Sequence, residues 1–232
     1  MNLIDNSFLY LILMILSIAY PLLNSFESKI YFVKKWKLLF PSIGIMMLVF
    51  IPWDIWFTKI GVWSFSDNFI IGYKIFHLPI EEWLFFIFIP FCCVFIHEVL
   101  QYYFPINKLC FSSKLILFLA LILFFISFLF CDKLYTCCVS FITAFLLLVI
   151  SFKKKTFINN LIRTYLVSLI PFLLVNGILT GSFNNSIVLY NYSEIVNVRL
   201  LNIPLEDFVY CFSMLALTLL PYSYLKKKFQ KA

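Results

Sequence analysis

Pro79-Ile80-Glu81-Glu82-Trp83 and Pro204-Leu205-Glu206-Asp207-Phe208 are two copies of one pattern, in which a proline and an apolar residue precede two acids and an aromatic residue. Each copy opens a long hydrophobic segment. A charged side chain costs about 2.5–3.5 kcal/mol at a membrane centre on insertion scales. Because four of the eleven acidic residues stand at two such places, the duplication indicates that they have a function.

The composition is that of an integral membrane protein. The 232 residues are 63% hydrophobic, 21% aromatic and only 12% charged, whereas a soluble domain is about 25% charged. The first apolar segment, residues 3–23, has the length of about 20 residues that a membrane-spanning helix needs. It has neither a basic n-region nor a small-residue cleavage site, so we expect a retained span rather than a signal peptide.

We predict an all-α integral membrane protein with about seven transmembrane helices. Their approximate ranges are 3–23, 38–56, 79–103, 114–131, 134–151, 160–180 and 204–225. The segments at one side of these spans hold fourteen of the eighteen Lys and Arg residues. The positive-inside rule then places the N-terminus outside and the C-terminus in the cytoplasm of a cell-membrane protein. The net charge of +7 therefore reflects topology, with the lipid bilayer rather than nucleic acid as the partner.

Recognisable metal and cofactor motifs are missing from the sequence. The seven cysteines form no C-x-x-C and the chain has only two histidines, so we expect the cysteines to be small packing residues and expect no zinc site. There is no G-x-G-x-x-G motif and no P-loop, and glycine occurs five times. We therefore predict no bound cofactor and no metal, and chemistry carried by side chains.

The acidic pairs belong to longer matching stretches. Asp54 and Thr58, like Asn176 and Thr180, are four residues apart and share one helix face. Each of these pairs is followed by a polar outer loop, 59–78 or 181–203, and then by the acidic motif. The copies are offset by 122 residues at Asp54 and by 125 at Glu81, which indicates a small loop insertion.

The duplication predicts a domain organisation. We assign residues 1–110 to a first repeat of three spans, 111–133 to a linking transmembrane helix, and 134–232 to a second repeat. A single linking helix gives both repeats the same orientation, as in other membrane proteins built from parallel repeats. Both acidic pairs then lie on the outer side, within reach of one shared cavity.

Two interpretations of the acids compete. Proline in the first helical turn followed by acids is an ordinary helix start, favoured by the helix dipole. The duplication favours the alternative, in which one neutral and one ionised carboxyl group act as general acid and base in a desolvated pocket. Consecutive residues point about 100° apart on a helix, so we expect Glu81 and Glu206 to face the cavity while the second acid orients Asp54 or Thr58. The candidate catalytic residues are Glu81, Glu82, Glu206, Asp207 and Asp54.

Aromatic residues lie in the same layer as the acids. Aromatic faces attract cations by about 0.5–2 kcal/mol per contact, which suits a transient carbocation. The alternative is that these rings form an aromatic belt at the membrane interface. For Trp63 the belt and the site are equally favoured, and for Trp36 the belt is favoured. His97 and Glu98, near the cytoplasmic end, are predicted to form an interfacial pair. The candidate substrate-binding residues are Trp53, Trp56, Thr58, Trp83, Asn176, Thr180 and Phe208.

With these residues assembled, the chain resembles the membrane-integral, heterodimer-type lycopene cyclases of carotenoid biosynthesis, in their fused two-repeat form. The resemblance runs through Pro52-Trp53-Asp54, the segments 57–63 and 78–86, Val175 to Gly181, and 203–207. Ser64 and His97 depart from the expected glycine and tyrosine without disturbing the acidic motifs.

The resemblance implies a lycopene β-cyclase, an isomerase of the intramolecular-lyase type. Such an enzyme closes the acyclic end groups of lycopene to give γ- and β-carotene, and it has other carotenoid-synthesis enzymes as possible associates. A proton-coupled transporter of a small hydrophobic substrate stays open as the alternative. A retinal-binding receptor is excluded, because the last five spans carry no lysine at mid-membrane depth.

Overall fold

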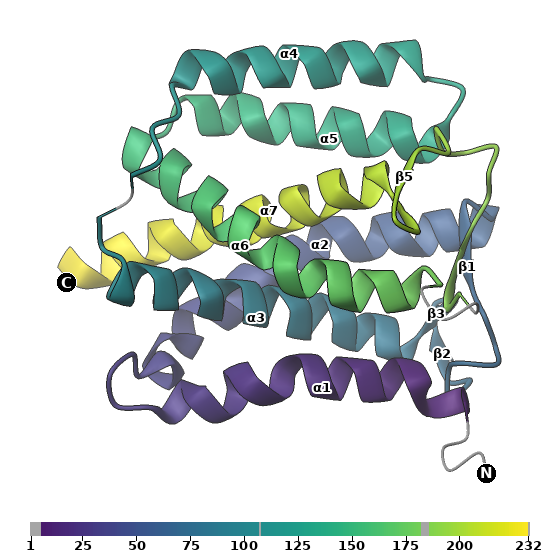
Figure 1. Cartoon of the computed structure of the whole chain (residues 1–232), viewed down its shortest axis with the longest axis horizontal. Coiled ribbons are helices and arrows are strands. Elements are labelled where there is room, and N and C mark those ends of the chain that lie inside the picture. Colours follow the sequence, from purple (N-terminus) through teal and green to yellow (C-terminus); the bar gives the residue numbers. More distant parts are fainter. Residues whose placement is uncertain (1–5, 107, 182–185, 232) are drawn as a thin grey trace.

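The structure, a computed structural model, describes residues 6–106, 108–181 and 186–231. Seven long α-helices run side by side through these residues (Figure 1). They are α1 (Leu9–Leu23), α2 (Trp36–Ile60), α3 (Ile80–Tyr103), α4 (Ser113–Leu129), α5 (Leu134–Ser151), α6 (Lys155–Leu179) and α7 (Leu205–Lys231). The 3₁₀ segments Asn6–Phe8 and Asn24–Phe26 extend α1, and a third, Phe32–Lys35, leads into α2.

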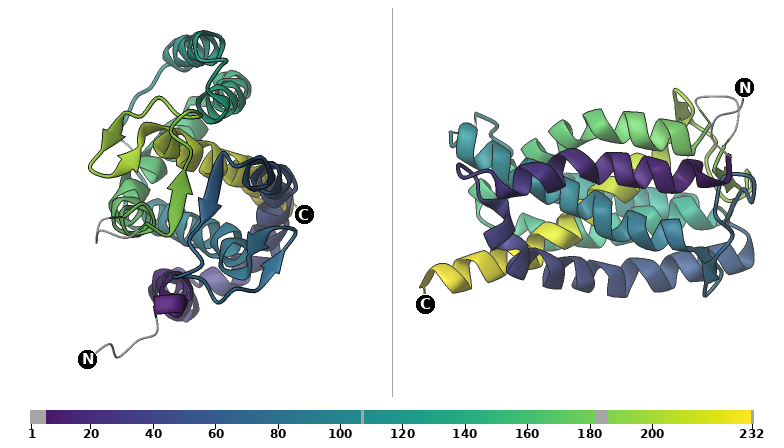
Figure 2. Two further views of the ribbon diagram at one scale, coloured as in Figure 1. Left: turned by 90° about the vertical axis from the view of Figure 1, so that its right-hand side faces the viewer. Right: turned by 90° about the horizontal axis from the view of Figure 1, so that it is seen from below.

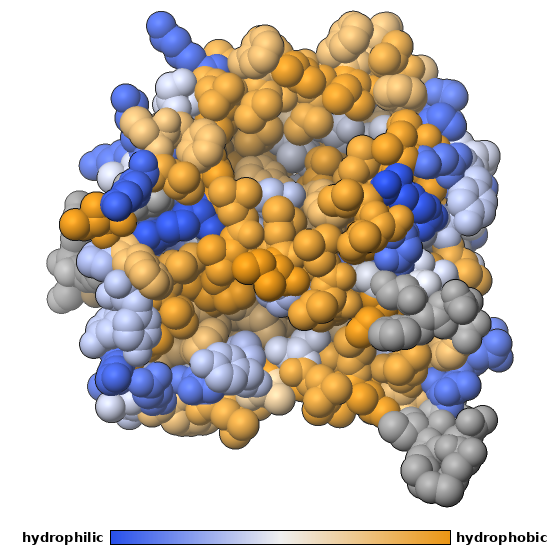
Figure 3. Space-filling view, in the orientation of Figure 1, coloured by the Kyte–Doolittle hydropathy of each residue, from blue (hydrophilic) through white to orange (hydrophobic). Residues whose placement is uncertain are grey.

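The predicted all-α membrane architecture is confirmed. Six of the helical segments are long and apolar enough to cross a membrane, and α4 is an apolar helix of 17 residues. Figure 3 shows an apolar face between hydrophilic groups at the two ends of the bundle. Each predicted span corresponds to one helix, including the shorter α4 at the fourth.

The packing repeats between the two halves of the chain. Helix α1 packs on α3 as α5 packs on α7, while α2 packs on α7 as α6 packs on α3. The middle helix of each half therefore packs on the last helix of the other half, as in a two-fold arrangement of parallel repeats. Helix α4 packs on α5 and lies at the edge of the bundle, seen end-on in Figure 2.

Short strands connect the helices at one end of the bundle, which we call the strand end (Figures 1 and 2). They are β1 (Trp63–Phe65), β2 (Lys74–Ile75), β3 (Leu78–Pro79), β4 (Val188–Tyr190), β5 (Arg199–Leu200) and β6 (Ile203–Pro204). Strand β1 pairs with β4 so that Ser64 lies opposite Leu189, its counterpart 125 residues later. This antiparallel register is what a two-fold axis through the strand pair requires.

A hairpin at the strand end fixes the start of each acidic helix. Strand β2 pairs with β3 directly before α3, and β5 pairs with β6 directly before α7. The Ile80 N–H donates to the carbonyl of Tyr73, and the Leu205 N–H donates to the carbonyl of Val198, both at 3.0 Å. The two hairpins thus hold both acidic pairs at one end of the bundle.

A buried ion cluster lies at the opposite end. Glu98, 2% exposed, accepts from Lys35 before α2 and from Lys226 of α7, each at 2.5 Å. Tyr222 donates to the same carboxylate at 2.9 Å, and His97 bonds to Thr164 of α6 at 2.8 Å. His97 and Glu98 lie at the end opposite the acidic motifs, as predicted, and their side chains join α3 to different helices.

Candidate active site

One acid of each motif lines a cavity of about 140 Å³ inside the bundle. These acids are Glu82 and Asp207, so the prediction that Glu81 and Glu206 face the cavity is wrong. Their carboxylates turn to the loops instead, where Glu81 accepts from the Ile71 N–H and Glu206 from the Val196 N–H, both at 2.8 Å. In each motif one acid faces the cavity and the other faces a loop, because adjacent helical residues point in different directions.

A tyrosine from the first helix of each half holds each cavity acid. The Tyr10 hydroxyl donates to Glu82 Oε2 at 2.5 Å, and the Tyr135 hydroxyl donates to Asp207 Oδ1 at 2.8 Å. All four side chains are buried. Both pairs span 72 residues, so the repeat preserves the acid together with its donor.

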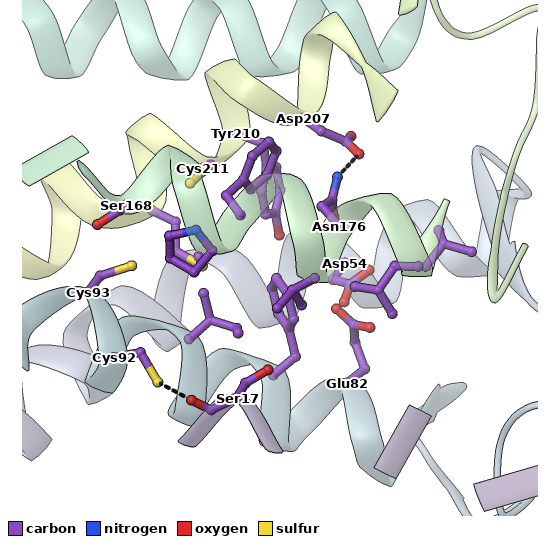
Figure 4. Close-up of a pocket in the computed structure, with 18 of the residues that line it drawn as sticks. Ser17, Asp54, Glu82, Cys92, Cys93, Ser168, Asn176, Asp207, Tyr210 and Cys211 are labelled. Atoms are coloured by element: carbon purple, nitrogen blue, oxygen red, sulfur yellow. Dashed lines mark hydrogen bonds between the residues drawn. The ribbon is translucent and has the colours of Figure 1, made fainter. Parts of the chain in front are cut away.

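The first half brings a second carboxyl group into the cavity. Asp54 accepts from the Trp63 indole N–H at 2.6 Å through Oδ1. Its Oδ2 is buried and has no hydrogen-bond partner among the described residues. Asp54 interacts electrostatically with Glu82, and Figure 4 shows their carboxyl groups together at the strand end of the cavity.

The second half has an amide where the first has this carboxyl group. Asn176 Nδ2 donates to Asp207 Oδ2 at 2.7 Å, and the Tyr190 hydroxyl donates to the same oxygen at 2.8 Å. With Tyr135, three neutral donors surround Asp207. Desolvation of the Tyr190 hydroxyl and the adjacent Asp207 carboxylate raise the pKa of Tyr190 well above its ordinary value, so Tyr190 remains a donor at neutral pH.

Aromatic rings form much of the wall around these acids. Trp63 meets Tyr135 edge-on with ring centroids 5.0 Å apart, and Tyr135 stacks on Tyr190 at 6.0 Å. Such faces stabilise positive charge in a site from which water is excluded. The aromatic residues of the wall are Tyr10, Trp63, Phe65, Phe85, Tyr135, Phe172, Tyr190 and Tyr210.

Only Asn176 of the predicted substrate-binding residues lines the cavity. Trp53 is buried behind the wall against Phe50 and Tyr210, and Phe208 packs on Phe172. The other four do not line the cavity. Trp56 is exposed, and the Trp83 indole N–H donates to the Ile75 carbonyl at 3.4 Å. Thr58 lies near Asp54 without a well-formed hydrogen bond, and the Thr180 hydroxyl donates to the Asn176 carbonyl.

The sequence-based prediction missed the tyrosines and Trp63. Tyr10 and Tyr135 are 125 residues apart, the offset that also separates Glu82 from Asp207. Extending the repeat comparison from the acidic motifs back to the first helices would have found this pair. The other site residues, Trp63, Tyr190 and Tyr210, have no identical residue at that offset, so the repeat carries no signal for them.

Comparison with known families agrees with this geometry. A model of the lycopene cyclase family matches residues 7–100 and again residues 132–225. The two matches begin just before Tyr10 and Tyr135, and each contains one acidic motif. No curated protein and no solved structure matches the chain. Because the two matches cover most of the sequence, the chain belongs to the lycopene cyclase family.

Proposed function

We propose that the protein is a lycopene β-cyclase that closes acyclic carotenoid end groups inside the membrane, converting lycopene to γ-carotene and β-carotene. The observation that carries this proposal is the meeting of Asp54, Glu82 and Asp207, from both repeats, in one aromatic-lined cavity. Membership of the lycopene cyclase family supports the carotenoid as substrate. The reaction is an isomerisation, because no atom is gained or lost overall.

The reaction needs one proton donor and one proton acceptor. A carboxylic acid protonates C2 of the terminal alkene, which leaves a cation at C1. The C5=C6 bond then attacks this centre, forming the C1–C6 bond and moving the positive charge to C5. Loss of the C6 proton to a carboxylate restores a C5=C6 double bond and completes the β-ring.

The two halves of the site are suited to opposite roles. Two neighbouring carboxyl groups that are removed from water do not both ionise, so Asp54 and Glu82 hold a proton between them. Asp207 accepts three hydrogen bonds from Tyr135, Asn176 and Tyr190, which favours its ionised form. We therefore assign the proton donor to the Asp54–Glu82 pair and the C6 proton acceptor to Asp207, which returns its proton to the pair between turnovers.

The cavity wall stabilises the carbocation and excludes water. The rings of Trp63, Tyr135 and Tyr190 lie around the acids and stabilise the cation at C1 and then at C5. Burial keeps out water that would trap the cation as an alcohol.

Expression in cells that accumulate lycopene tests the function. We expect cyclic carotenoids to replace lycopene, resolved by chromatography of the pigment extract. Unchanged lycopene, despite a folded protein in the membrane, would refute the proposal. Proton-coupled flux of a small hydrophobic substrate in proteoliposomes would favour the transporter.

The cofactor requirement is a separate prediction. We expect the purified protein in lipid to cyclise lycopene without bound flavin and without metal, because a carboxylic acid supplies the electrophile. The measurements are the visible absorption spectrum of the protein and turnover before and after chelation. A stoichiometric flavin spectrum, or loss of activity with chelator, contradicts this prediction.

The membrane orientation is also proposed. We place the N-terminus and the strand end outside the cell membrane and the lysine-rich end in the cytoplasm, with residues 1–110 and 134–232 as parallel repeats around the linker 111–133. Reporter fusions at positions 68 and 190 should both report the outer side, and a cytoplasmic signal at either position would contradict the orientation.

The tyrosine donors provide a test of the site. Tyr10→Phe and Tyr135→Phe each remove one hydrogen bond from a cavity acid without changing the ring. A hydrogen bond to a charged group is worth about 1.5–3 kcal/mol, so we expect turnover to fall about 10- to 100-fold. Tyr165→Phe is the matched control, because Tyr165 donates to the Phe208 carbonyl rather than to an acid. Equal activity in all three variants would show that the tyrosines do not act on the acids.

A further inference from the structure

The cavity does not share the two-fold symmetry of the helices around it. Helices α3 and α6 contribute six lining residues each, whereas α2 and α5 contribute one each. Along α3 the wall runs from Glu82 to Ile96, a rise of about 21 Å. The acids and Asn176 gather at the strand end, and the rest forms a largely apolar arm that includes Ser17 and Ser168. Figure 4 shows Cys92, Cys93, Ser168 and Cys211 in this arm, away from the acids.

The exposure of the lining residues indicates that the arm opens sideways between α1 and α6. These helices contact each other near the strand end, where Tyr10 and Met14 cluster with Leu179. Further along, Ser17 of α1 and Cys92 of α3 line the cavity and are only half-buried, and Pro171 of α6 lines it while being exposed. The surface beside Pro171 is apolar, with Ile170 and Leu174 exposed on α6, so the opening faces lipid.

The equivalent place in the other half is filled. The repeat relates Phe172 of α6 to Phe50 of α2, and Val175 to Trp53. Phe50 is fully buried and packs 4.9 Å from Tyr210, and Trp53 packs 5.2 Å from the same ring. Phe50 and Phe172 are the same residue type, so the halves differ in Trp53, whose ring occupies the volume that Val175 leaves free on the α6 side.

We propose that an acyclic polyene enters end-first from the lipid through the opening between α1 and α6, and that the apolar arm holds the polyene chain while the end group reaches the acids. This inference rests on the proposed function and adds the substrate route. The opening between α1 and α6 admits one end of the substrate at a time, while the other end stays in the lipid. The two rings of a bicyclic product are then closed in separate binding events.

Two variants narrow this route without touching the acids. Ser168→Phe fills the arm, and Ser17→Trp narrows its rim. The matched controls are Leu166→Phe and Leu16→Trp, which place the same new rings on neighbouring lipid-facing positions that are exposed. Thermal stability and monodispersity in detergent identify any variant that fails to fold. The rim variant is the safer one, because Ser17 is only half-buried.

Two readouts decide the outcome. The first is cyclic carotenoid formed from lycopene, and the second is lycopene that co-purifies with the same variants in a Glu82→Gln background, measured by visible absorption. We expect both readouts to fall by about tenfold or more in Ser168→Phe and Ser17→Trp, because each added ring occupies space in the arm that the polyene chain needs. The controls should stay within about twofold, as surface changes do.

The two proposals fail in different ways. If Ser168→Phe and Ser17→Trp fold and leave both readouts unchanged, the route between α1 and α6 is wrong whatever the reaction. If the unmodified chain forms no ring, the cyclase function fails, and the lycopene-binding readout still decides the route.

Discussion

Replacing Glu82 by glutamine or Asp207 by asparagine should abolish ring formation, with turnover lowered by at least about 10²–10⁴-fold, the usual contribution of a general acid or base. The amide keeps the shape of the side chain and removes proton transfer. Folding should change little, because a neutral amide is cheaper to bury than a carboxylate. Cyclic product from lycopene and thermal stability in detergent are the two measurements.

The neighbouring acids of the same motifs supply the matched controls. In Glu81→Gln and Glu206→Gln the amide oxygen can still accept from the N–H of Ile71 or Val196, so most activity should remain. A catalytic role for Glu81 or Glu206 would produce the reverse ranking, with these variants inactive and the Glu82 and Asp207 variants active. That ranking would overturn the assignment of the cavity acids.

Asp54→Asn tests the difference between the halves. It gives the first half the amide that the second half already has at Asn176. If Asp54 and Glu82 share the reacting proton, this change should also lower turnover by about 10²-fold or more. Normal activity of Asp54→Asn would show that Glu82 donates the proton without sharing it with Asp54.

Glu98→Gln should lower the free energy of unfolding by about 3 kcal/mol, the lower end of the range for breaking a buried ion pair. The lower end applies because Lys35 and Lys226 are 27% and 29% exposed, so water and lipid headgroups partly solvate the lysines that remain. Without the carboxylate, the two ammonium groups repel each other between α2 and α7. Denaturation in mixed micelles measures the change.

The chain offers a matched control and a rescue. Asp67→Asn breaks the exposed pair with Lys74, where Asp67 is 80% exposed, and should change stability by less than about 1 kcal/mol. Adding Lys226→Met to Glu98→Gln removes one of the two unpaired charges, and with it the repulsion between them, and should restore part of the stability. Glu98 lies 16 residues beyond Glu82, about 24 Å along α3, so cyclisation per folded molecule should be unchanged. Stability equal to that of the unmodified protein would show that the cluster does not clamp the helices.

The sequence was a good guide wherever length and polarity decide the structure. Seven apolar segments predicted seven helices, because a chain in lipid must satisfy its backbone hydrogen bonds within each segment. The repeated acidic motif predicted that both acid pairs lie at one end of the bundle. By contrast, the strands β1–β6 were predicted as loops, because their two- and three-residue pairings leave too short a pattern to recognise.

The sequence could not predict which acidic side chain of each motif faces the cavity. Glu81 and Glu82 are adjacent and chemically alike, and either could have faced the cavity. The hairpin before α3 sets the rotation of the first turn, and the Ile71 N–H then binds Glu81. A tertiary contact ten residues upstream therefore selects Glu82 for the cavity, and Val196 does the same for Asp207.

By itself, then, the sequence determined the membrane location of the helices, their number, the repeat and the residues able to exchange protons, since these follow from hydrophobic length, offset and side-chain chemistry. Tertiary structure alone decided which acids meet, which tyrosines hold them, and that the cavity is lined mainly by α3 and α6, while Trp53 is buried in α2. The physical reason is that side-chain direction and cavity shape depend on contacts between helices far apart in the chain. The local sequence pattern of a helix cannot predict those contacts.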